Sequence, residues 1–303
     1  MTAAFLQSEL TSLIQDSKRK HPGVLQAAES SLAGLKAISV TSETQVVGDL
    51  VRKLHFIEPF LLALQSQNAK LASTAATGMQ RLVSYSAIPT GRVEDVLTSL
   101  ESGVKLSTEV QLKILQTLPA LVQQYDLHGQ NFFRVLNLSA GIVNSKDTVA
   151  VGIASASLQQ LILGAIETPD DTSQDSDGKE GIKDVPTIFN DLSLLIAGKK
   201  PKHINVASLP QMLTLACIES MLLQQGTIIL ENEACLESTT NFLIPTLVIL
   251  CVEGRAFNTT AYACRIGLML VHADYTGLNP SRCELLNDFD CSSECSMKKM
   301  SWT

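Results

Sequence analysis

Aromatic residues and positive charge are both in short supply in this chain. Of its 303 residues only 5% are Phe, Trp or Tyr while 45% are hydrophobic, so a core must be built mainly from Leu, Ile, Val and Ala. Such a composition favours helices, because strands are enriched in aromatic and β-branched side chains. The formal net charge of −7 argues against a duplex nucleic-acid binder, which needs a large basic excess. No nucleic acid is therefore expected as a partner.

Sequence motifs of catalysis and cofactor binding are also missing. The chain contains no Gly-x-Ser-x-Gly, no phosphate loop, no His-Glu-x-x-His and no Gly-x-Gly-x-x-Gly. Its five histidines are scattered singly, at positions 21, 55, 128, 203 and 272. We therefore predict no catalytic residue and no cofactor, and we expect that the chain is not an enzyme.

Metal-ligand patterns are incomplete. Cys283, Cys291 and Cys295 have spacings of seven and three intervening residues and no fourth ligand in register, whereas structural zinc needs a tetrahedral set. A calcium loop with Gly178 as its sixth residue would start at Ser173 instead of at an acid. We predict no metal site.

A long uninterrupted apolar run is lacking as well. The most apolar stretch, Phe242 to Val252, contains a proline and is far shorter than the ~20 residues of a membrane span. The N-terminus has polar residues every few positions, unlike a secretory signal. Four of the seven cysteines lie in apolar contexts that are typical of buried free thiols in a reducing cytosol: Cys217, Cys235, Cys251 and Cys264.

Helical periodicity runs through most of the chain. Apolar residues at positions 5, 6, 10, 13 and 14 form one helical stripe, and Pro22 suits the first turn of a second helix. Further helices are predicted over 43–55, 57–66, 68–85, 91–104, 107–124, 130–144, 147–166, 184–197, 206–225, 231–250 and 256–272. No convincing run of strand-like alternation is present.

A four-residue signature recurs along these helices: apolar, Gln or Glu, polar, apolar. It begins at Met79, Leu115, Leu158 and Ile218, and the last interval contains a polar insert whose removal leaves the spacing near ~40 residues, the armadillo and HEAT period. Small residues accompany the signature and are also frequent in the helix predicted over 22–38. We therefore expect this helix to lie in the same layer of stacked helices as those that carry the signature. The pattern predicts an all-α, armadillo/HEAT-like, right-handed α-solenoid of stacked repeats; a generic helical bundle with coincidental spacing is the alternative.

The domain organisation follows from composition. We expect armadillo repeats over 1–166, an acidic disordered insert over 167–184, a continuation of the solenoid over 185–275 and an irregular tail over 276–303. The insert is rich in Asp, Ser and Gly and nearly free of apolar side chains, so it cannot bury enough surface to order itself.

Two basic clusters stand out against the acidic whole. One contains Lys18, Arg19 and Lys20; the other contains Lys199, Lys200 and Lys202. Each basic side chain near an anionic leaflet contributes about 1 kcal/mol, so such clusters support reversible membrane contact. We predict that these six residues contact anionic lipid; plain solvated charge is the alternative.

Three stretches carry a resemblance to a known family. The segments "KHPGVLQAAES" (20–30), "AATGMQRLVSYSAI" (75–88) and "LKILQTLPALV" (112–122) resemble the N-terminal region of the Mon-two family of Golgi and endosome scaffolds, relatives of the large Arf guanine-nucleotide exchange factors BIG and GBF. The resemblance covers about 1–255 and implies a dimerisation and cyclophilin-binding (DCB) domain followed by the start of a homology-upstream (HUS) domain.

The resemblance also implies a function. The chain would be a non-enzymatic scaffold module in endosome-to-Golgi and Golgi-to-vacuole transport, cytosolic and peripherally bound to trans-Golgi and early endosome membranes. Implied partners are a Dopey-type trafficking protein, an aminophospholipid flippase, an Arf-family GTPase, anionic lipid and a second copy of the chain. The alternative is the N-terminal regulatory and dimerisation region of an Arf exchange factor. A karyopherin-like adaptor is disfavoured because Trp302 is the single tryptophan.

Overall fold

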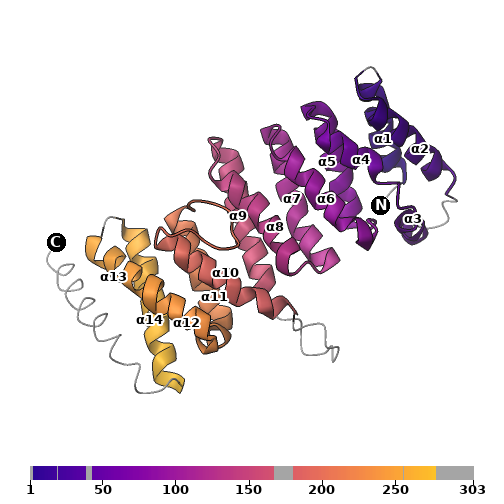
Figure 1. Ribbon diagram of the computed structural model, residues 1–303. Coiled ribbons are helices and arrows are strands. Elements are labelled where there is room, and N and C mark those ends of the chain that lie inside the picture. Colours follow the sequence, from indigo (N-terminus) through magenta and orange to yellow (C-terminus); the bar gives the residue numbers. More distant parts are fainter. Residues whose placement is uncertain (1–2, 19, 39–42, 167–179, 255, 278–303) are drawn as a thin grey trace. The chain divides into compact units, whose positions relative to one another are not determined.

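The computed structural model describes residues 3–18, 20–38, 43–166, 180–254 and 256–277, which form helices and no strands (Figure 1). They fall into two compact units, up to residue 157 and from residue 158, with the division inside one long helix. The first unit contains α1 (Ala3–Ser17), α2 (Pro22–Lys36), α3 (Glu43–Val51), α4 (Glu58–Gln65), α5 (Ala69–Ser84), η1 (Thr90–Arg92), α6 (Val93–Gly103), α7 (Thr108–Tyr125), α8 (Gly129–Val143) and the start of α9 (Thr148–Ile166).

Helices of the first unit stack in two layers. In one layer α1 packs on α5 and α5 on α7; in the other, α2 packs on α4, α4 on α6 and α6 on α8. The layers are joined within each repeat, for example by α4 against α5 and by α7 against α8. The predicted all-α helical-repeat solenoid is therefore confirmed. Helix α2 lies opposite the layer of α5 and α7, so the layer predicted for it was wrong.

The recurring signature marks the core of one helix in each repeat. All eight of its apolar positions are buried: Met79, Leu82, Leu115, Leu118, Leu158, Leu161, Ile218 and Met221. They lie on α5, α7, α9 and α11 (Gln211–Glu231). Residues three apart share one side of a helix, so each signature supplies two neighbouring contacts to the core.

Small residues permit close helix approach at two sites. A side chain added at Gly78 of α5 would meet the buried Phe60 ring of α4 at 2.3 Å, and one at Gly103 of α6 would meet Leu64 at 2.9 Å. In α2, Ala28 and Ser31 are buried but Ala33 is exposed. The tight contacts thus form where α4 crosses the helices that follow it.

Two arginines tie neighbouring helices together. Arg92 donates to Glu58 Oε2 of α4 and to the Leu54 carbonyl oxygen, both at 2.8 Å. Arg134 of α8 donates to Glu101 Oε1 of α6 at 2.8 Å. These pairs are partly exposed, and such pairs contribute at most about 1 kcal/mol each.

Helix α9 begins at a cap built by Asp147. Its Oδ1 accepts from the backbone N–H groups of Val149 and Ala150, and its Oδ2 accepts from Thr108 Oγ1 at 3.0 Å. The bond from the Ala150 N–H is the largest cause that holds the pKa of Asp147 below its ordinary value of 3.8. The carboxylate thus links the start of α9 to the start of α7.

Asp147 gives the first unit an acid-sensitive contact. Because its pKa is lowered in the folded state, its stabilising contribution is fully present above 3.8 and is lost as the pH falls through the depressed value. We expect Asp147→Asn to be less stable than wild type at neutral pH, with the difference shrinking at strongly acidic pH. Thermal melts across a pH series measure this; a pH-independent difference would contradict it.

The second unit is also built from packed helices. It contains the end of α9, α10 (Glu180–Ile196), α11, α12 (Glu233–Ser238), the π-helical turn η3 (Thr239–Leu243), α13 (Ile244–Glu253) and α14 (Phe257–Gly277). Helix α11 packs on α10 and α14, and α10 also packs on α12. Residues 167–179 of the predicted insert, and the predicted tail from 278 onward with its three cysteines, lie outside the described residues.

Two predicted boundaries in this unit differ from the structure. Helix α10 begins at Glu180, so residues 180–184, predicted to be disordered, are helical, with Asp184 buried. Helix α11 begins only after Pro210 and continues to Glu231 through a kink at Gln225, where φ is −131° and ψ is 27°. Pro210 delays the start because its ring favours extended backbone in the residue before it.

Three helical segments are long and apolar enough to cross a membrane, judged by length and composition alone: Thr148–Ile166, Gln211–Glu231 and Glu233–Glu253. The sequence prediction missed them because it searched for uninterrupted apolar runs, whereas these segments carry interspersed polar residues. In the structure they pack against other helices of the two units, and between 39% and 50% of the most apolar 18-residue window of each is buried.

Candidate membrane-contact site

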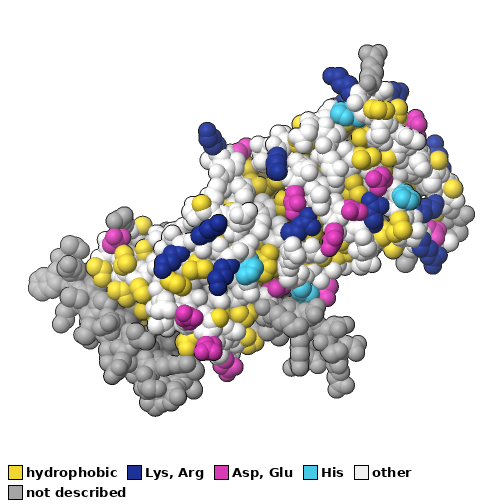
Figure 2. Space-filling model, in the orientation of Figure 1, with side chains coloured by type: hydrophobic (Ala, Val, Ile, Leu, Met, Phe, Trp, Pro, Cys, Tyr) yellow, Lys and Arg dark blue, Asp and Glu magenta, His cyan; other side chains and the backbone are white. Residues whose placement is uncertain are grey.

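The second basic cluster lies in the loop between α10 and α11. Helix α10 ends at Ile196 and is followed by a turn at Gly198, whose φ of +69° suits glycine. In this turn Gly198 N–H donates to the Leu195 carbonyl and Lys199 N–H donates to the Leu194 carbonyl. Beyond this turn, Pro201 and Ile204 are buried and the three lysines are exposed. Figure 2 shows dark-blue side chains gathered over this loop, with yellow side chains beside them.

A buried carboxylate holds the loop in place. Asp191 of α10, only 1% exposed, accepts from the backbone N–H of Lys202 at 2.9 Å, of His203 at 2.6 Å and of Ile204 at 2.7 Å. Its charge is thus satisfied by the backbone, and the loop is fixed from beneath. The lysine side chains remain on the exposed side of the loop.

Lys199 connects the loop to the π-helical turn η3. Its ammonium lies 4.1 Å from the centroid of the Phe242 ring in η3, a cation–π contact. The first lysine of the cluster therefore lies above an aromatic side chain of the neighbouring element. Lys200 and Lys202 flank buried Pro201 and extend the positive patch.

The structure brings only half of the predicted site together. Lys18 and Lys20 are exposed just after the end of α1 in the first unit, and Arg19 lies outside the described residues. Helix α1 ends at Ser17, before these cations, and its last turn contains no basic side chain. Lys18 and Lys20 thus belong to the first unit, and Lys199, Lys200 and Lys202 belong to the second.

Sequence reasoning missed two residues of the loop site, Asp191 and Phe242. A signal for Asp191 was present: it follows Ile188 by three residues and precedes Leu195 by four, which places an acid on the apolar face of its helix. Its backbone partners, however, lie 11 to 13 residues further along, and only the folded loop brings them to it.

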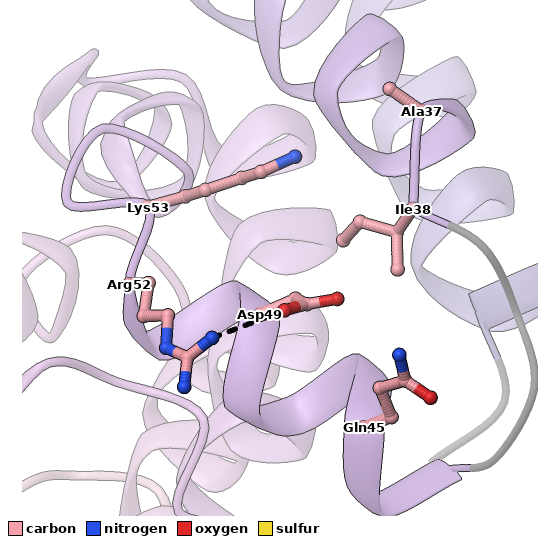
Figure 3. Close-up of a pocket in the computed structure, with 6 residues that line it drawn as sticks. All are labelled: Ala37, Ile38, Gln45, Asp49, Arg52 and Lys53. Atoms are coloured by element: carbon pink, nitrogen blue, oxygen red, sulfur yellow. Dashed lines mark ion pairs between the residues drawn. The ribbon is translucent and has the colours of Figure 1, made fainter.

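A surface pocket of about 370 Å³ lies in the first unit between α2 and α3, lined by Ala37, Ile38, Gln45, Asp49, Arg52 and Lys53 (Figure 3). Asp49 pairs with Arg52 at 3.8 Å, and Lys53 Nζ donates to the Gly34 carbonyl at 2.7 Å. Its charged groups thus have partners already, and the lining does not gather the convergent ionisable groups that acid–base chemistry needs.

Buried thiols support the predicted role of the cysteines as core residues. Burial raises the pKa of Cys217 to about 12 and that of Cys235 to about 11. Cys251 is also buried, and burial and then its hydrogen bond with Cys264 raise its pKa to about 12. Thiols with such raised pKa values are poor nucleophiles at neutral pH. Cys264 is only half-buried, contrary to prediction.

Comparison with known proteins now decides the family. The family model for the Mon2/Sec7/BIG1-like dimerisation and cyclophilin-binding (DCB) domain matches residues 2–167, more than half of the chain. The chain belongs to the Mon2/Sec7/BIG1-like family. The family's HUS domain model matches residues 181–286. The resemblance drawn from the sequence is confirmed, and neither matched domain is a catalytic one.

Individual relatives agree with this assignment. Protein MON2 of Saccharomyces cerevisiae is 27% identical over 298 residues, which cover 90% of this chain and 18% of that protein. Monensin-resistant homolog 2 of Caenorhabditis elegans is 27% identical over 72% of this chain and 15% of its own length. The Homo sapiens MON2 homolog is 24% identical over 54% of this chain and 9% of its own length. The chain therefore spans less than a fifth of the relatives it matches.

Proposed function

We propose that the chain is a non-enzymatic scaffold module of a membrane-trafficking protein, which contacts anionic membranes through its basic clusters. Membership of the Mon2/Sec7/BIG1-like family supports the scaffold role. The proposed membrane contact is supported by the loop that Asp191 holds in place. This loop exposes Lys199, Lys200 and Lys202 on one surface of an otherwise acidic chain. Three adjacent cations suit reversible binding to anionic headgroups.

The proposal extends to location and partners. The module acts in the cytosol at trans-Golgi and early endosome membranes, in endosome-to-Golgi and Golgi-to-vacuole transport. Its partners there are a Dopey-type protein, an aminophospholipid flippase and an Arf-family GTPase. The description of the DCB domain as a dimerisation domain supports self-association. Sedimentation over a concentration series measures that association.

Vesicle flotation tests the membrane contact. On phosphatidylcholine vesicles containing phosphatidylserine, we expect a triple variant to bind about hundredfold more weakly than wild type, since each lysine contributes about 1 kcal/mol. This variant replaces Lys199, Lys200 and Lys202 with Glu. The pair Lys18→Glu and Lys20→Glu measures the first cluster separately. On vesicles of phosphatidylcholine alone, binding should be weak.

A matched control keeps the change in net charge constant. Lys36, Lys105 and Lys146 are exposed lysines that lie far apart in the sequence, and changing them together to Glu should leave flotation nearly unaltered. If both triple variants lost the same amount of vesicle binding, the overall charge of the chain and not the loop would account for that binding. A wild-type chain that does not float at all would overturn the membrane part of the proposal.

A second function, the regulatory region of an Arf exchange factor, is favoured by the Sec7 and BIG1 names in the family description. The relatives described above are Mon2 or monensin-resistant proteins, which favours the scaffold. A nucleotide-exchange assay on Arf with full-length protein separates the two: acceleration would favour the exchange factor.

A further inference from the structure

Exposed apolar side chains form a stripe along η3 and α13. Ile249 and Val252 are 54% and 65% exposed, and Phe242 is half-buried at the start of the stripe. The interval of three residues places Ile249 and Val252 on one side of α13, and Phe242 precedes them in η3. The opposite side supplies the core through buried Leu243, Leu247 and Cys251. We call Phe242, Ile249 and Val252 the apolar stripe.

A proline explains the irregular turn that carries Phe242. Pro245 stands at the second residue of α13 and has no N–H to donate to the preceding turn. Its ring also crowds the carbonyl four residues earlier, and the backbone responds by widening into the π-helical turn Thr239–Leu243. Phe242 lies in this widened turn, directly beneath Lys199.

The apolar stripe begins where the basic loop ends. The contact of Lys199 with Phe242 at 4.1 Å joins the two. Ile249 lies seven residues beyond Phe242, about 10 Å along the helix axis. In Figure 2 the dark-blue side chains of the loop lie next to yellow side chains, which continue over α13. One surface of the second unit therefore places three cations beside a row of exposed apolar groups.

We propose that this surface docks on an anionic bilayer, with the lysines at the headgroups and the apolar stripe inserted at the boundary with the acyl chains. The inference rests on the proposed membrane contact and adds its apolar half. Cations beside exposed aliphatic and aromatic groups are the pattern of interfacial membrane binding. The lysines alone support only reversible contact, and the inserted apolar side chains strengthen it and make part of it insensitive to salt.

Flotation of the full chain on phosphatidylcholine–phosphatidylserine vesicles tests this directly. Raising salt from about 0.1 M to about 1 M shortens the screening length from about 10 Å to about 3 Å, which removes the electrostatic part. We expect Ile249→Ser with Val252→Ser to lower the partition coefficient about tenfold and to leave the residual binding fully sensitive to salt. Wild type should keep a salt-resistant fraction.

The first unit offers a matched control. Leu54 and Val149 are 53% and 60% exposed, close to Ile249 and Val252, and changing both to Ser should leave flotation unaltered. Equal effects of the two pairs would overturn the proposal. The proposal would also be overturned if the lysine changes abolished binding while the Ile249 and Val252 changes did not alter it. In that case the proposed lipid contact of the lysines would remain.

Two further outcomes identify other occupants of the apolar stripe. If the Ile249 and Val252 changes convert a dimer to a monomer in sedimentation without altering flotation, the stripe is a self-association surface and the proposal fails. If neither wild type nor any variant floats, the proposed membrane contact fails together with this inference. Thermal melts of each variant should match wild type, because the replaced side chains are exposed.

Discussion

Replacing Gly78 with valine should destabilise the first unit by about 3 kcal/mol. Gly78 is buried on α5, and even a first side-chain carbon would lie 2.3 Å from the Phe60 ring of α4. Phe60 is itself fully buried, so its ring has no open space to enter. The two helices must separate or Phe60 must leave its preferred rotamer. Denaturant unfolding measures the loss.

A second glycine provides the control. Gly141 lies on α8, is exposed and has nothing within 4 Å of an added side-chain carbon. Gly141→Val should be nearly neutral, since valine is a somewhat better helix former than glycine. If the two variants lost equal stability, the close contact between Gly78 and Phe60 would not be the cause.

A double-mutant cycle locates the clash. Phe60→Ala alone should cost about 3–5 kcal/mol because it leaves a cavity. In the Gly78→Val background the same change should cost clearly less, since the new side chain fills part of that space. Strict additivity of the two changes would contradict the contact between Gly78 and Phe60.

Replacing Asp191 with alanine should destabilise the second unit by about 3 kcal/mol. The carboxylate, 1% exposed, accepts three backbone N–H groups of the basic loop, and the Ile204 N–H lies in a buried environment. Hydrogen bonds to charged groups contribute about 1.5–3 kcal/mol each, and buried donors left without an acceptor add a further cost. Thermal or denaturant unfolding measures the change.

Limited proteolysis separates a local from a global effect of Asp191→Ala. Trypsin cuts after lysine, and cleavage at Lys199 and Lys202 should accelerate in the variant under conditions where the rest of the unit stays folded. Asp191→Asn, which keeps one acceptor oxygen, should fall between alanine and wild type. Asp49→Ala is the control, because Asp49 makes only a 3.8 Å contact with an exposed arginine. Unchanged stability and cleavage in Asp191→Ala would show that Asp191 does not hold the loop in place.

The sequence by itself determined the fold class and most of the helices. An aliphatic composition excluded an aromatic-rich sheet, and the signature at Met79, Leu115, Leu158 and Ile218 located the buried side of one helix in each repeat. These inferences succeeded because helical periodicity is local: residues three and four apart share a face whatever the rest of the chain does.

Only the tertiary structure decided the layers, the tight contacts and the surface of the second unit. The small residues of α2 predicted its layer wrongly, because a small side chain permits close approach without specifying the neighbour. Asp191 and its loop, and Lys199 and Phe242, are separated by 11 to 43 residues in sequence. Such pairs meet only once the helices between them are packed, so no local pattern records them.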